Sequence, residues 1–225
     1  MDGATVRYLG PVGPDSDARR GPLTSWTGWD VRGGAAAGVD AVETLARLPD
    51  VGSGADARYE LIAVAARGFR PPQFLRSFEL PDKMGAEGQL AEEEWPDRLK
   101  PAWSVLYRRV AETAPASVTP YAIYLLGVNP PTDITSAELD VFNDFYTHVH
   151  MPEVADRRHA LRAERYELVR ETRSPYRGAP RFLAVYELDQ AAAANRRHVG
   201  PPYAAGPDVW QRHTTPWRLW YRRVG

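Results

Sequence analysis

A histidine and a tyrosine that stand one helical turn apart are the residues best suited to chemistry in this chain. His150 precedes Met-Pro-Glu, and Tyr146 lies four residues earlier, so both side chains should share one face of a helix. Imidazole titrates near neutral pH and can take up and return a proton within one reaction. We therefore predict that His150 is a general acid/base and that Tyr146 orients a substrate oxygen. The alternative is a structural histidine that hydrogen-bonds the chain near Pro152.

The other four of the five histidines are weaker candidates. His198 opens a His-Val-Gly-Pro-Pro-Tyr segment, and we predict that it assists the acid/base chemistry. His148 lies two residues before His150, a spacing that places side chains on different helical faces, so we expect it at the surface. His159 and His213 are also expected there. A His-x-His pair without a third ligand is a weak metal signal, and we predict no bound metal.

Composition removes several classes of function. The chain has no cysteine, which excludes disulfides, thiolate catalysis and iron–sulfur clusters. A formal net charge of −1 argues against a nucleic-acid partner, and no apolar run is long enough to span a membrane. No secretory signal pattern is present, so we expect a cytoplasmic protein. Phosphate-binding loops, dinucleotide fingerprints and zinc-protease motifs are missing, and we predict no cofactor.

Five short stretches of the first half recur in the same order in the second half. ARYELI at 57–62 returns as ERYELV at 164–169, and AWSVLYRRV at 102–110 returns as PWRLWYRRV at 216–224. Repetition of this kind indicates one supersecondary unit written twice.

Each copy has the order strand, helix, two strands, helix, strand, which is the ferredoxin-like unit. The sequence therefore predicts an α+β protein in which two tandem β-α-β-β-α-β repeats pack sheet against sheet as an α/β barrel. The first repeat would span 1–112, a linker 113–120, and the second repeat, with the active site, 121–225. Helices are expected at four places: 35–48, 87–99, from Ser136 to Pro152, and 190–197.

Two local signals refine this prediction. Thr135 and Glu138 form a capping box that should start the third of these helices at Ser136. The stretch from Pro11 to Gly34 has no counterpart in the second copy and reads as a long loop, either a lid or a surface insertion whose tryptophans cap the core.

The stretch DFYTHVHMPEV at 144–154, followed by RYELV and a closing WRLWYRRV, resembles the dimeric α/β-barrel superfamily. It is most similar to the branch of EthD-like proteins, small polyketide cyclases and cofactor-free monooxygenases. The resemblance implies a pocket beside His150 and a pseudo-dimer within one chain, which can pair again as a homodimer. Arg47 takes the place of the histidine in the first copy, so we predict that this copy has lost its site.

We predict a cofactor-independent enzyme that binds a small apolar, aromatic or polyketide-like molecule and acts as a cyclase, isomerase, dehydratase or lyase. Predicted substrate contacts are aromatic: Phe142, Tyr124, Tyr166 and Trp217. Both tyrosines can point either into the pocket or into the interface between the repeats. Three alternatives stay open at this point: a cofactor-free monooxygenase, a non-catalytic binding or accessory protein, and a heme enzyme.

Overall fold

The computed structural model describes residues 7–8, 21–31, 42–43, 45–46, 56–66, 71–80, 99–113, 118–173, 178–196 and 202–224. The strands are β1 (Arg7–Tyr8), β2 (Leu23–Val31), β3 (Asp56–Ala66), β4 (Phe74–Glu79), β5 (Leu99–Glu112), β6 (Ala122–Asn129), β7 (Arg162–Arg173), β8 (Phe182–Leu188) and β9 (Thr214–Val224). The labelled helices are α2 (Ser136–Phe145), the π-helical turn η2 (Tyr146–His150), α3 (Met151–Arg157), α4 (Gln190–Ala194) and α5 (Asp208–Gln211).

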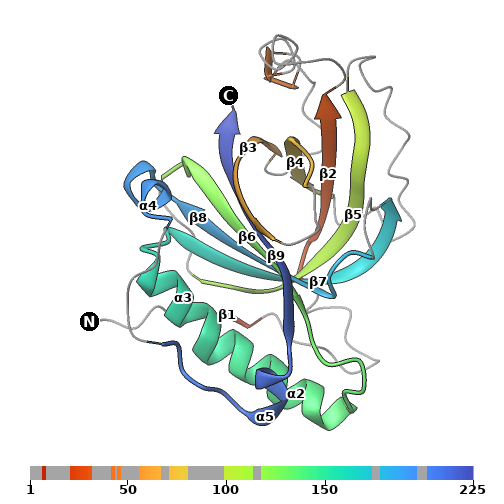
Figure 1. Ribbon diagram of the computed structural model, residues 1–225, viewed down its shortest axis with the longest axis vertical. Coiled ribbons are helices and arrows are strands. Elements are labelled where there is room, and N and C mark those ends of the chain that lie inside the picture. Colours follow the sequence, from red (N-terminus) through yellow and green to blue (C-terminus); the bar gives the residue numbers. More distant parts are fainter. Residues whose placement is uncertain are drawn as a thin grey trace.

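Eight of the strands close into an antiparallel barrel (Figure 1). Around it the order is β5-β2-β4-β3-β9-β6-β8-β7, and β7 pairs with β5 to complete the ring. The two-residue strand β1 adds to the end of β5. The long strands β3 and β9 pair from Arg58 with Val224 to Ala66 with Trp217, with one register shift along the way.

The predicted α+β architecture, two tandem ferredoxin-like repeats forming a dimeric α/β barrel, is wrong. We expected two separate sheets packed face to face; the strands instead form one continuous barrel, and the chain is rich in strand with few helices. The physical reason lies at the sheet edges. Unpaired edges leave backbone N–H and C=O groups open, and here β3–β9 and β5–β7 pairing satisfies them.

The first half differs most from the expected elements. Of the helix predicted at 35–48, residues 42–43 and 45–46 are helical and the rest lies outside the described residues. The helix predicted at 87–99 also lies outside them, apart from Leu99, which already belongs to β5. Arg47, the proposed mark of a lost site, is likewise outside the described part of the chain.

The stretch predicted as a loop from Pro11 to Gly34 contains strand β2, which pairs with both β4 and β5. Its glycine concealed this strand in the sequence, because glycine weakens a strand pattern. A Cβ at Gly28 would lie 2.5 Å from Cγ of Pro72, so only glycine permits this close approach. Trp26 is 2% exposed and faces the interior, which supports a role in the core.

Large apolar and aromatic side chains fill the barrel. Trp103 and Trp217 meet edge to face, with ring centroids 5.6 Å apart. Two similar hydrogen bonds join strands to segments distant in sequence. The Tyr107 hydroxyl on β5 donates to the Pro180 carbonyl before β8 at 2.7 Å, and the Tyr221 hydroxyl on β9 donates to the Pro72 carbonyl before β4 at 2.8 Å. The barrel is therefore a packed core over much of its length.

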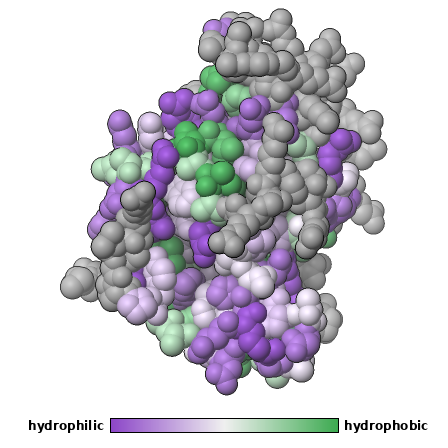
Figure 2. All heavy atoms as spheres, in the orientation of Figure 1, coloured by the Kyte–Doolittle hydropathy of each residue, from purple (hydrophilic) through white to green (hydrophobic). Residues whose placement is uncertain are grey.

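One long helical segment covers the outer surface of the second half (Figure 1). The capping box is confirmed: the Thr135 hydroxyl accepts a hydrogen bond from the Glu138 amide at 3.2 Å, and the Glu138 carboxylate accepts one from the Thr135 amide at 2.9 Å. Phe142 is buried against the barrel, while the visible surface over α2 and α5 is mostly hydrophilic (Figure 2). None of the described helices has the length and apolar character needed to cross a membrane.

Candidate functional site

The predicted helix does not end at Pro152; it continues through a π-helical turn into α3, which ends at Arg157. Proline is tolerated here because it lies in the first turn of α3, where no intrahelical N–H bond is required. In the turn, the Met151 N–H donates to the Tyr146 carbonyl five residues back. Such single π turns often occur at functional sites. This one carries Tyr146 and His150.

Aromatic rings surround the His150 imidazole. The centroid of the imidazole lies 4.6 Å from the ring centroid of Trp210, 5.3 Å from that of Tyr203 and 5.9 Å from that of Tyr146. Phe145 stacks at 6.3 Å. The Nδ1 atom is buried and has no hydrogen-bond partner among the described residues. A buried polar nitrogen without a partner is unfavourable and is rare in native proteins.

Burial, and to a smaller extent the positive groups of His213, Arg157 and Arg218, lower the pKa of His150 to about 4. The imidazole is therefore neutral at pH 7, with one nitrogen as a donor and the other as an acceptor. His213 stacks on Trp210 with centroids 4.1 Å apart, and its Nδ1 donates to the Trp210 carbonyl at 2.5 Å. Burial also lowers the pKa of His213.

The segment that carries Tyr203 is attached to α3 by a carboxylate. Glu153 accepts a hydrogen bond from the Ala204 N–H at 3.1 Å and pairs with Arg157 on its own helix. The Arg157 guanidinium lies 4.5 Å from the Tyr203 ring centroid. Glu153 is thus occupied in fixing the cover over His150.

Gly206 brings the next part of this cover close to the helix. It has φ of +69°, and a Cβ there would lie 2.6 Å from Trp210 and 2.7 Å from Phe145. Only glycine combines this backbone conformation with so little space. The aromatic cage therefore depends on Gly206 to bring Trp210 against the helix.

A positively charged aromatic surface adjoins the cage. The Arg158 guanidinium lies 4.5 Å from the ring centroid of Tyr124, which stacks on Trp220 at 4.6 Å. The charge of Arg218 acts to lower the pKa of Tyr124, but burial dominates and raises it. Arginine charges beside a neutral imidazole can stabilise an anion that forms when the imidazole removes a proton.

A buried arginine on the barrel holds the helix in place. Arg165 on β7 is 1% exposed and donates to the Thr147 hydroxyl at 2.9 Å and to the Asn143 side-chain oxygen at 2.5 Å. Its guanidinium also lies 4.4 Å from the Tyr146 ring centroid. Arg165 thereby holds the π turn, and with it His150, against the barrel.

The structure brings only some of the predicted site residues together. Tyr146, Phe142 and Tyr124 belong to the same buried cluster on the outer face of the barrel, next to His150. Tyr166 and Trp217 instead point into the barrel interior, on the other side of the sheet. Residues along a strand alternate between the two faces of the sheet. Which face each aromatic residue occupies therefore depends on the strand register, which spacing alone does not define.

His198 lies outside the described residues, so the structure does not describe its place. His148 is at the surface, where its Nδ1 lies 2.9 Å from an Asp144 carboxylate oxygen. Within the described ranges, no cluster of three His, Asp or Glu side chains could hold a metal ion.

Sequence reasoning missed the residues that enclose His150 from outside the helix. Trp210, Tyr203 and His213 come from the segment before β9, more than fifty residues away. Their only available signal was the density of aromatic residues between 203 and 221, which fits a core equally well. His213 was expected at the surface, but it is partly buried against Trp210.

No known family model matches this chain, and no curated protein matches it either. Its function must therefore be inferred from the site itself.

Proposed function

We propose that this protein is a cofactor-independent enzyme in which His150 moves a proton on a small aromatic or polyketide-like molecule. One observation carries the proposal: a buried imidazole, neutral at pH 7, keeps Nδ1 unpartnered among the described residues inside a cage of four aromatic rings. Flat ligands stack well on such rings. The proposal includes a cytoplasmic location and a small-molecule partner.

The proposed reaction begins when the neutral imidazole takes a proton from a carbon or phenol of the substrate. The electron pair of the broken bond stays on the substrate as an enolate or phenolate, which the charges of Arg157 and Arg218 stabilise. The imidazolium then returns the proton to another atom of the same molecule. This sequence accounts for isomerisation or cyclisation without a cofactor.

The substrate class follows from the cage and from the sequence resemblance to EthD-like proteins and small polyketide cyclases. The alternative of a cofactor-free monooxygenase shares the first step and differs in that the substrate anion then reacts with oxygen. An assay without oxygen separates these two.

The test is proton exchange on an enolisable aromatic ketone. We would incubate 2-tetralone with the protein in D2O and follow loss of its α-hydrogen NMR signals. We expect the protein to accelerate exchange, His150→Gln to abolish the acceleration, and His148→Gln, an exposed neighbour, to retain it. Equal activity of both variants would refute the role of His150.

A further inference from the structure

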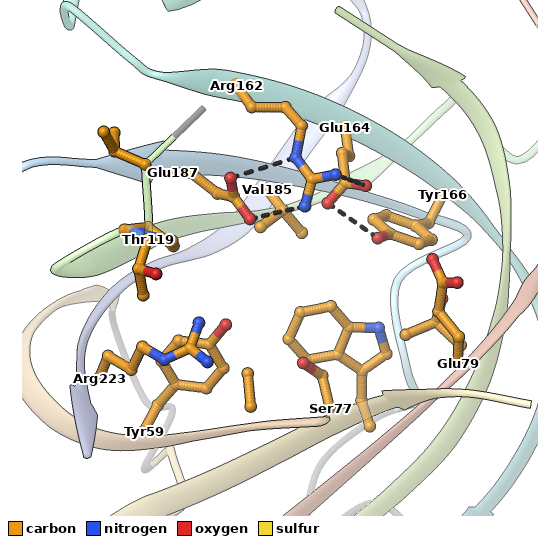
Figure 3. Close-up of a pocket in the computed structure, with 15 residues that line it drawn as sticks. Tyr59, Ser77, Glu79, Thr119, Arg162, Glu164, Tyr166, Val185, Glu187 and Arg223 are labelled. Carbon is orange, nitrogen blue, oxygen red and sulfur yellow. Dashed lines mark hydrogen bonds and ion pairs between the residues drawn. The ribbon is translucent and has the colours of Figure 1, made fainter. Parts of the chain in front are cut away.

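The barrel contains a cavity of about 330 Å³ that is separate from the His150 cage (Figure 3). It lies inside the sheet, among residues of β2, β3, β4, β7, β8 and β9. The aromatic side chains of Trp26, Tyr59 and Tyr166 line it. Val118 and Thr119 at its rim are exposed, so the cavity opens to solvent on that side.

One wall of this cavity carries carboxylates whose charge is compensated. Glu187 accepts hydrogen bonds from Arg162 at 2.7 and 3.1 Å. Glu164 accepts one from Arg109 at 2.6 Å and one from the Tyr166 hydroxyl at 3.0 Å, as Figure 3 shows for the tyrosine. These acids already have donors, so they form a structural network and do not call for a cationic ligand.

A third carboxylate at the rim is also paired. Glu79 lies 3.0 Å from Arg109 and its side chain is 32% exposed. The same arginine also lies 3.5 Å from Glu112. Arg109 is therefore shared among Glu79, Glu112 and Glu164, and solvent screens the partly exposed Glu79.

Two residues that line the cavity, Thr24 and Trp26, also carry buried polar atoms without a described partner. The Trp26 Nε1 and the Thr24 hydroxyl find no hydrogen-bond acceptor among the described residues, and the two residues are only 2% and 4% exposed. Buried polar groups in native proteins are nearly always satisfied. The indole N–H can only donate, so its burial without an acceptor is unfavourable.

Arg223 is a positively charged side chain in this cavity without a described carboxylate partner. It lines the cavity beside Tyr59 (Figure 3), and no described carboxylate forms an ion pair with it. Its neighbour Arg222 points to the other face of β9 and pairs with Glu60. A guanidinium is charged at every accessible pH and binds carboxylates with matching geometry.

We infer that this cavity binds a small aromatic carboxylate, with its acid group on Arg223 and its ring among Trp26, Tyr59 and Tyr166. The cavity has the volume of a small-ligand site and combines apolar walls with few polar groups, as such sites do. This site is distinct from the His150 cage and does not depend on the proposed reaction.

The probe for this site is 6-hydroxy-2-naphthoate, with 6-hydroxy-2-naphthamide as the uncharged control. Binding is measured by titration followed through the indole N–H NMR signal of Trp26, which is identified by its loss in Trp26→Phe. We expect the carboxylate to shift this signal and to bind about tenfold or more tightly than the amide, because only the carboxylate pairs with arginine.

Two arginine variants make the test specific. Arg223→Gln should weaken naphthoate binding about tenfold and remove the preference over the amide, whereas Arg222→Gln should leave both unchanged. His150→Gln should also leave binding unchanged, which separates this site from the cage. Three results would each overturn the inference: no shift of the Trp26 signal, equal binding of acid and amide by the unmodified protein, or loss of binding in His150→Gln.

Discussion

The burial of His150 should make the stability of this protein depend on pH in a defined direction. In the unfolded chain His150 has its ordinary pKa of 6.5, and in the folded protein burial and nearby positive groups lower it to about 4. Between these values the unfolded state binds a proton that the folded state rejects. Stability contributed by the neutral imidazole is therefore complete above pH 6.5 and is lost as pH falls toward 4.

The magnitude follows from the two pKa values. At about 1.4 kcal/mol for each pH unit between them, the full loss is about 3 kcal/mol, and about 2 kcal/mol of it should be gone at pH 5. Glutamine at position 150 cannot be protonated in this range. His150→Gln should therefore lose about 2 kcal/mol less unfolding free energy than the unmodified protein between pH 7.5 and pH 5.

The assay is urea unfolding at both pH values, followed by tryptophan fluorescence. His213 also has a lowered pKa and is present in both proteins, so the comparison reports the change made at position 150, including the coupling between the two histidines. His148→Gln keeps His150 and should retain the pH dependence of the unmodified protein. If the unmodified protein and His150→Gln lose the same free energy, the imidazole is not held in an apolar cage and the reasoning fails.

Three other changes test how the fold positions the site. Gly206→Ala should destabilise the protein by about 2 kcal/mol more than Gly178→Ala, because both glycines have positive φ but only the first has no space for a Cβ; equal melting temperatures would contradict this. Tyr107→Phe should cost about 1–3 kcal/mol in urea unfolding, since it leaves the buried Pro180 carbonyl without its donor; no change would mean that the bond is not formed. Thr135→Ala should cost about 1 kcal/mol by loss of the helix cap, again by urea unfolding, and an unaltered midpoint would count against the cap.

Local signals in the sequence predicted local structure well. The capping box at Thr135 located the start of α2, and the repeated stretches at 57–62 and 164–169 lie within strands β3 and β7. These elements follow from contacts between near neighbours in the chain. The strand β2 was missed because Gly28 interrupts its pattern, and the reason for that glycine is the distant Pro72.

The closure of the barrel was not predictable from these local patterns. It depends on pairing between β3 and β9 and between β5 and β7, which lie far apart in the sequence. The site likewise combines residues that local spacing predicts with residues that only the distant contacts of the fold bring in. His150 and Tyr146 share a helix face and were found by spacing, while Trp210 and Tyr203 reach the cage through a distant segment that Glu153 fixes.

The proposed role of His150 as a neutral proton carrier is tested most directly by the pH dependence of kcat/KM for deuterium exchange into 2-tetralone. This quantity reports ionisation in the free protein. We predict that exchange is constant from pH 8 to pH 5, falls by half near the His150 pKa of about 4, and is absent in His150→Gln, with circular dichroism confirming the folded state at each pH. A half-point near 6.5, or a profile unchanged in His150→Gln, would contradict the buried-imidazole mechanism.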